Sequence, residues 1–178
     1  MKILKHIRCL FILLLVHTSM MLSAQNKTSV SIKAQATVID RSGIELITLK
    51  NMDIDLSMAR DGKIYVSALH DAQAAFMMVK GRANARFRIK YAPEVYITNS
   101  TGNGTLLLKY EMYGYPSDNQ GAGEPIDATE KILQMSNESK YYFWIGGRID
   151  ISNARPGNYD GEFTIEIEYM QYESNNTA

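Results

Sequence analysis

Strict alternation of apolar and polar residues is the feature that most limits how this chain can fold. Phe163, Ile165, Ile167 and Tyr169 alternate with the polar residues Thr164, Glu166 and Glu168. Residues 30–38 alternate in the same way, and so does the shorter run of residues 86–90. A period of two puts successive side chains on opposite faces of a strand, so each run predicts a strand with one buried and one solvated face.

Further short runs lie between these strands, and turn residues separate them. The runs are residues 44–49, 63–67, 74–80, 95–98, 105–112 and 141–151. Turn signals are clear at Asp61-Gly62 and Pro156-Gly157. Helical patterning is poor: residues 127–135 could hold one helical turn, and the polar residues 116–125 predict a mobile loop. Many short strands at this spacing predict an all-β fold, an antiparallel sandwich or a barrel.

The N-terminal residues predict export. Basic residues precede an apolar run over residues 10–16, and Leu22-Ser23-Ala24 has the small residues of a cleavage site. We therefore expect a signal peptide over residues 1–24, a short extension over 25–29, one domain over 30–171 and a polar tail over 172–178. We expect the protein to contact the membrane only during export and to be located in the periplasm, at the outer surface or in the medium.

Cleavage after Ala24 would leave few residues for catalysis. Cys9, the one cysteine, would be lost, and His70 would be the one histidine left. Thiol nucleophiles, thiolate zinc sites and two-histidine metal sites are then excluded. Three of the 19 basic residues precede Gln25 and none of the 19 acidic ones do, so the rest of the chain would carry a net charge of about −3. Such a charge does not indicate a nucleic-acid-binding protein. The sequence predicts no enzyme, no catalytic residue, no cofactor and no metal.

Oxygen-bearing side chains form two kinds of candidate ligand site, carboxylate pairs on strands and polar clusters in loops. The carboxylate pairs Asp53/Asp55 and Glu166/Glu168 would each share one strand face, where solvated charges are common. Calcium could be held by either of two loop clusters, although neither has the spacing of a dedicated calcium loop. They are Asp118, Asn119, Glu124 and Asp127, and Asn158, Asp160 and Glu162. Tight turns need the same residue types without any ion.

Two strands offer candidate contacts for a ligand or a partner. Residues 141–144 are Tyr-Tyr-Phe-Trp, of which alternate members would enter the core, so Tyr142 and Trp144 remain candidates for stacking on sugar rings. Arg86, Arg88 and Lys90 could grip an anionic polysaccharide. Alternatively, the acidic strand around Glu166 and Glu168 would lie beside this basic strand, where opposite charges stabilise a strand pair.

Short glycine-centred motifs carry a resemblance to a known family. They are Gly146-Gly147, then Pro156-Gly157-Asn158-Tyr159-Asp160-Gly161, then the run from Phe163 to Tyr169, with Ala34 to Val38, Asp61-Gly62, Ala75-Phe76 and Gly81 upstream. This order resembles domain-of-unknown-function family 4402, exported bacterial proteins common in the Bacteroidetes. The chain departs from the family at residues 52–56, where a Leu-x-Phe-Gly pattern is usual. The resemblance implies an immunoglobulin-like antiparallel β-sandwich, similar to pilin and spore-coat-U domains, and no catalytic residues.

The function expected from these features is structural. We expect a secreted or surface-exposed subunit that contacts proteins or copies of itself through sheet edges, as in a fimbria-like or coat-like assembly. Residues 30–38 would serve either as the first strand of their own domain or as a strand donated to another copy. The alternative function is a carbohydrate-binding module that uses the exposed aromatic residues or the basic strand.

Overall fold

The computed structural model describes residues 29–38, 43–127 and 129–170. The predicted signal peptide, most of the extension and the polar tail lie outside these residues. Strands and two short 3-10 helices make up the regular structure, and the described residues form no α-helix. In this part of the chain no helix is long and apolar enough to cross a membrane.

The described residues form twelve strands, and the prediction of an all-β fold is confirmed. In chain order they are β1 (Ser29–Val38), β2 (Glu45–Lys50), β3 (Met52–Asp55), β4 (Lys63–Val66), β5 (Ala75–Lys80), β6 (Arg86–Tyr91), β7 (Glu94–Asn99), β8 (Thr105–Tyr115), β9 (Glu124–Pro125), β10 (Lys131–Gln134), β11 (Lys140–Asp150) and β12 (Tyr159–Tyr169). The 3-10 helices are η1 (Leu56–Met58) and η2 (Gln120–Ala122).

One continuous hydrogen-bonded sheet folds back on itself to make the sandwich. Its order is β10-β6-β12-β7-β8-β11-β5-β2, with β1 between β12 and β3, β4 on β11, and β9 on β8. The fold turns at β7, which pairs with β12 through its last two residues and with β8 along most of its length. The β10-β6-β12 side of the sheet thereby comes to face the β8-β11-β5 side.

Aromatic contacts between these two sides form the core. Phe87 of β6 lies 5.6 Å from Tyr141 of β11, ring centroid to centroid, and Phe163 of β12 lies 4.2 Å from Tyr110 of β8. Neither contact joins hydrogen-bonded neighbours, so both bridge the two layers. All four side chains are at most 9% exposed. Rings of this size account for much of the apolar area that such a core buries.

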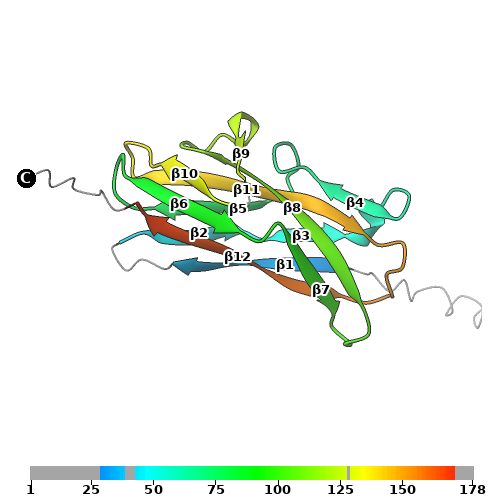
Figure 1. The fold of residues 1–178 in the computed structure, drawn as a ribbon. Coiled ribbons are helices and arrows are strands. Elements are labelled where there is room, and N and C mark those ends of the chain that lie inside the picture. The colour runs from blue at the N-terminus through cyan, green and yellow to red at the C-terminus, as the bar shows by residue number, and fades with distance from the viewer. Residues whose placement is uncertain (1–28, 39–42, 128, 171–178) are drawn as a thin grey trace, which may run out of the picture.

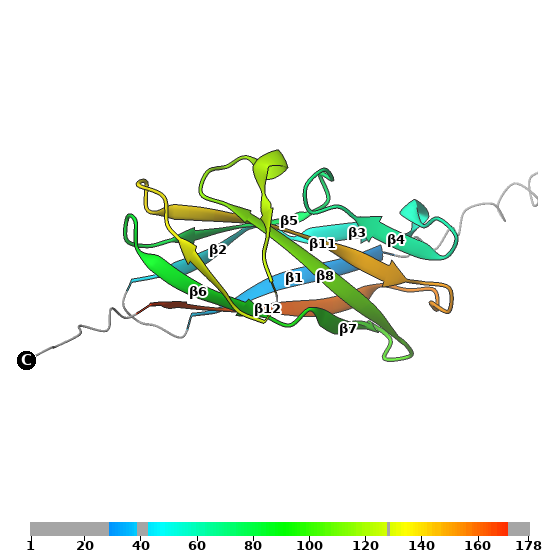
Figure 2. The same cartoon turned by 45° about the horizontal axis from the view of Figure 1, so that its top comes forward.

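The first strand pairs with the last one. Val30 to Val38 of β1 run parallel to Tyr159 to Ile167 of β12, and the other edge of β1 pairs antiparallel with β3. Both views show the blue N-terminal strand beside the orange-red C-terminal one (Figures 1 and 2). The sandwich is thus antiparallel except for this pair. Of the two roles expected for residues 30–38, the structure shows the strand in its own domain.

The segment around β10 differs from the prediction. Residues 127–135 were expected to allow a helical turn, yet Lys131–Gln134 form a strand that pairs with Gln134 opposite Arg86 and Lys131 opposite Ile89. Leu133 is buried while Ile132 and Gln134 are exposed, which is a two-residue period. The four residues are too few to separate this period from a helical one in the sequence alone. Packing against β6 decides in favour of the strand.

Candidate functional site

The aromatic run of β11 divides between the two faces of the sheet. Tyr141 and Phe143 enter the core, as the alternation predicts, and Tyr142 and Trp144 lie on the outer face. Tyr142 is half-buried, whereas Trp144 is only 3% exposed. Trp144 therefore offers almost no ring surface to solvent.

The ring of Phe76, on β5, stacks with the rings of Tyr142 and Trp144. Its centroid lies 5.3 Å from that of Trp144 with an interplanar angle of 11°, and 5.9 Å from that of Tyr142 with an angle of 16°. Nearly parallel rings at these separations are offset-stacked, an arrangement that stabilises aromatic pairs. A sugar ring would have to displace one member of this stack. The predicted contact at Tyr142 and Trp144 stays untested, but its geometry favours a structural role.

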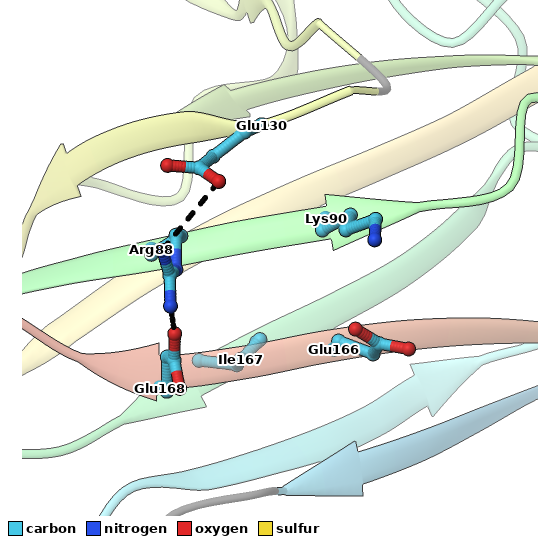
Figure 3. A pocket seen from close by; sticks show the side chains of 6 residues that line it. All are labelled: Arg88, Lys90, Glu130, Glu166, Ile167 and Glu168. Atoms are coloured by element: carbon cyan, nitrogen blue, oxygen red, sulfur yellow. Dashed lines mark ion pairs between the residues drawn. The ribbon is translucent and has the colours of Figure 1, made fainter.

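The basic strand β6 lies beside the acidic strand β12. Lys90 is directly opposite Glu166, and Arg88 is opposite Glu168. The guanidinium of Arg88 lies between two carboxylates, in contact with Glu168 and 3.5 Å from an oxygen of Glu130 (Figure 3). The prediction that opposite charges pair across these strands is confirmed. Each exposed pair contributes only a few tenths of a kcal/mol to about 1 kcal/mol.

These charges define a shallow hollow of about 290 Å³. Its lining combines two basic and three acidic side chains with Ile167, namely Arg88, Lys90, Glu130, Glu166 and Glu168. The hollow is therefore slightly acidic, which suits an anionic polysaccharide poorly. Arg86, the third predicted basic contact, is exposed and pairs with Gln134 at the start of the same strand.

The loop before β12 is built from hydrogen bonds within the chain. Tyr159 is buried, and its hydroxyl group donates to the carbonyl oxygen of Arg155 (3.0 Å) and accepts the amide of Arg155 (2.9 Å). The carbonyl oxygen of Asn158 accepts the amide of Ser100 at 2.7 Å. Among the described residues, no three His, Cys, Asp or Glu side chains gather where a metal ion could bind. The structure gives this loop the role of a corner between strands.

His70 lies in a turn that the neighbouring aspartate stabilises. A carboxylate oxygen of Asp71 accepts the amide of Ser67 at 2.6 Å, and the amide of Asp71 donates to the carbonyl oxygen of Ser67 at 3.1 Å. The side chain of His70 itself is exposed. The side-chain amide Nε2 of Gln120, in η2, donates to the carbonyl oxygens of Ala68 and Asp71, which ties residues 116–125 to this turn.

A groove beside β10 was not foreseen from the sequence. Among the described strands β10 pairs with β6 alone, so its other edge is open. Along that edge lies a cavity of about 630 Å³, lined by all four residues of β10, by Tyr115, Glu124 and Tyr141, and by residues 116–117 and 136–138. An open edge beside a partly aromatic groove is the kind of surface to which an extended chain adds as a further strand.

Comparison with known families gives one match. Residues 57–169 match the model described as "Domain of unknown function (DUF4402)". The chain belongs to this family. No curated protein matches the chain significantly. The DUF4402 match begins inside η1 and ends at the last residue of β12, so β1, β2 and β3 precede it.

The glycine pair of the DUF4402 region has a packing reason. A β-carbon on Gly146 would lie 2.5 Å from the amide nitrogen of Ala68 and closer still to the carbonyl oxygen of Val66. A β-carbon on Gly147 would lie 2.5 Å from the carbonyl oxygen of Lys109. Backbone atoms cannot move aside as the end of a side chain can, so only glycine fits at Gly146, next to the chain leaving β4, and at Gly147, next to β8. The glycine pair within the DUF4402 region is thus required by the packing of the fold.

Proposed function

We propose that this chain is an exported, non-catalytic structural protein that makes protein contacts through the open edge of β10. In a fimbria-like or coat-like assembly at the cell surface, the partner would be a second copy of the chain. The observation that carries the proposal is the open edge itself, together with the groove beside it. Ile132, at the middle of the strand, is 41% exposed and lines this groove, so it is available to a partner at the open edge.

The residues of β10 suit pairing with the same strand of a second copy. In an antiparallel pair centred on Ile132, each Ile132 would face its counterpart, and Glu130 would face Gln134. Glu130, Ile132 and Gln134 are all exposed, so they occupy the outer face together. No like charges would meet across this pair, and such a two-fold contact is the commonest symmetry of homo-oligomers. The sheet would then continue from one copy into the next.

Sedimentation of the purified protein over a range of concentrations tests the proposal. We expect reversible association that Ile132→Lys abolishes, because this substitution sets two ammonium groups opposite each other. Leu49→Lys is the matched control: Leu49 is 47% exposed on β2, at the other end of the sheet, and its substitution should leave the association intact. A protein that stays monomeric at every concentration, or that associates equally well with Ile132→Lys, would overturn the proposal.

Export is tested separately, by expression of the full chain in a bacterial host. If residues 1–24 act as a signal peptide, the protein recovered from the periplasm or the medium begins at Gln25. Retention of the full-length chain in the cytoplasm would contradict this part of the proposal and would leave the β10 contact to be judged on its own.

A further inference from the structure

Two exposed tyrosines share one face of the sheet, across four strands. Tyr65 of β4 lies opposite Arg148 of β11, Arg148 lies opposite Lys109 of β8, and Lys109 lies opposite Glu94 of β7. Residues directly opposite in a sheet project from the same face, and so do residues two apart on a strand. Tyr96, two residues after Glu94, therefore belongs to this face. We call these five residues the Tyr65–Tyr96 face.

Both rings are accessible, unlike those of Tyr142 and Trp144. Tyr96 is 69% exposed and Tyr65 is 49% exposed, the two highest values among the exposed large hydrophobic side chains of the described residues. The order β4-β11-β8-β7 separates the strands that carry them by three intervals. At about 4.8 Å per interval, the backbones of β4 and β7 lie roughly 14 Å apart across the sheet, and Tyr96 is two residues further along β7 than Glu94, which is in line with Tyr65. This distance is too long for one monosaccharide and suits a short oligosaccharide.

Neighbouring side chains fix the orientation of Tyr65. Its hydroxyl group donates to a carboxylate oxygen of Glu111 at 2.8 Å, and the guanidinium of Arg148 lies 5.0 Å from the ring centroid. This cation–π contact covers one face of the Tyr65 ring and helps to fix the ring in place. The same carboxylate oxygen of Glu111 accepts the amide of Ala68 at 3.2 Å, which ties the ring to the backbone. A ring already held in place loses little entropy when a ligand stacks on it.

Charges of opposite sign balance on this part of the surface. Three basic and three acidic side chains lie on the rows of the face: Lys63, Lys109 and Arg148, and Glu94, Glu111 and Asp150. Lys109 and Glu94 form an ion pair at 2.9 Å. The surface is rich in hydrogen-bond donors and acceptors but has no net charge. A balanced field of this kind complements an uncharged, hydroxyl-rich ligand better than a polyanion.

We infer that the Tyr65–Tyr96 face binds an uncharged oligosaccharide. The apolar faces of two sugar units stack on the two tyrosine rings, and the charged side chains between them hydrogen-bond the hydroxyl groups. This inference does not depend on the β10 contact, because the two surfaces are made of different residues. It assigns to the chain a binding function at a place different from the aromatic run of β11.

Calorimetric titration with cellotetraose, maltotetraose and mannotetraose tests the inference, with tetragalacturonate as the charged comparison. We expect one neutral tetrasaccharide to bind and the uronate to bind more weakly. Tyr65→Ala and Tyr96→Ala should each weaken binding about tenfold, the loss of one stacking contact. The matched control Tyr142→Ala, which removes an aromatic ring from another part of the same sheet, should leave affinity unchanged.

Three results would overturn the inference. They are the absence of binding by all three neutral sugars at millimolar concentration, preferential binding of the uronate, and affinities that Tyr65→Ala and Tyr96→Ala leave unchanged. Circular dichroism establishes that each variant is folded. Ile132→Lys should retain sugar binding, and the two tyrosine variants should retain association, so failure of one proposal is distinguishable from failure of the other.

Discussion

The hydroxyl group of Tyr159 closes the corner before the last strand by bonding both backbone groups of Arg155. The tyrosine is 1% exposed, so its two hydrogen bonds satisfy groups that water reaches poorly. Tyrosines that bond backward over a few residues fix corners in other β-sandwiches. This contact determines the angle at which the chain enters β12.

Tyr159→Phe should therefore lower the free energy of unfolding by roughly 1 to 2 kcal/mol, because the ring remains while the Arg155 groups lose their partner. Urea unfolding measures the difference. Tyr96→Phe is the control, since Tyr96 is 69% exposed, and it should change stability by less than about 0.5 kcal/mol. Equal stabilities for the two variants would show that the hydrogen bonds of the Tyr159 hydroxyl group do not contribute to the free energy of unfolding.

Gly146→Ala should be among the most damaging single substitutions in the chain. The added methyl group would meet the backbone of Val66 and Ala68, which cannot move aside easily, and we expect a cost near the upper end of the range of about 1 to 3 kcal/mol that is typical of overpacking. Gly121→Ala is the control, because a β-carbon there has one neighbour, the side-chain oxygen of Asn119 at 4.0 Å. Thermal unfolding of both variants gives the comparison, and a Gly146→Ala protein as stable as Gly121→Ala would refute the packing argument.

Tyr110 and Tyr91 should respond in opposite ways to loss of their hydroxyl groups. Both rings contact Phe163, but the buried hydroxyl of Tyr110 has no hydrogen-bond partner among the described residues, whereas that of Tyr91 donates to the carbonyl oxygen of Ile126 at 3.0 Å. We expect Tyr110→Phe to raise the free energy of unfolding by about 1 kcal/mol and Tyr91→Phe to lower it by a similar amount. Denaturant unfolding measures both free energies. Equal destabilisation of the two variants would contradict this explanation.

Stability should fall at alkaline pH. Burial raises the pKa of Tyr91 and of Tyr141 to about 12, and it raises the pKa of Tyr110 as well. The unfolded chain releases these protons near pH 10 while the folded chain keeps them, so their stabilising contribution is complete below pH 10 and is lost as the pH rises to about 12. Urea unfolding at intervals of about one pH unit between roughly pH 8 and 12 measures this decrease in the free energy of unfolding. The double variant Tyr91→Phe, Tyr141→Phe should show a shallower decline, and an unchanged slope would contradict the assignment.

Trp144 is the one tryptophan of the chain, so its fluorescence reports directly on the outer face of β11. With 3% exposure, it should emit at short wavelength and resist quenching by acrylamide until the protein unfolds. Phe76→Ala removes the stacked neighbour and should increase quenching in the folded state. Strong quenching of the unsubstituted folded protein would show that the stack is open and would revive Trp144 as a sugar contact.

The strands longer than about five residues could be predicted because alternation over that length excludes a helix. β11 lies where the pattern of residues 141–151 puts it, and the charge pairing of β6 with β12 followed from complementary sequences. β12 contains the predicted run 163–169 but begins four residues earlier, at Tyr159. Four of the described strands have four residues or fewer, and of these only β4 was predicted, because the turn signal Asp61-Gly62 marks its start. β3, β9 and β10 take their conformation from neighbouring strands. Such short pieces carry too little pattern of their own.

The surfaces proposed for binding depend on register, which a single sequence does not contain. Tyr65 and Tyr96 are separated by two strands between their own, and nothing in the chain order suggests that they share a face. Tyr142 and Trp144 lie two residues apart on one face of β11, where both stack with Phe76 of the neighbouring strand.

The parallel pair of β1 and β12 sets the order in which this molecule can be completed. A ribosome delivers β1 first and β12 last, so residues 30–38 wait for about 130 further residues before their partner exists. Until then the alternating strand is available to any other chain with an open edge. During synthesis, β1 is thus the strand most open to pairing with another chain. A molecule that binds β1 during synthesis would therefore change the yield of correctly folded protein.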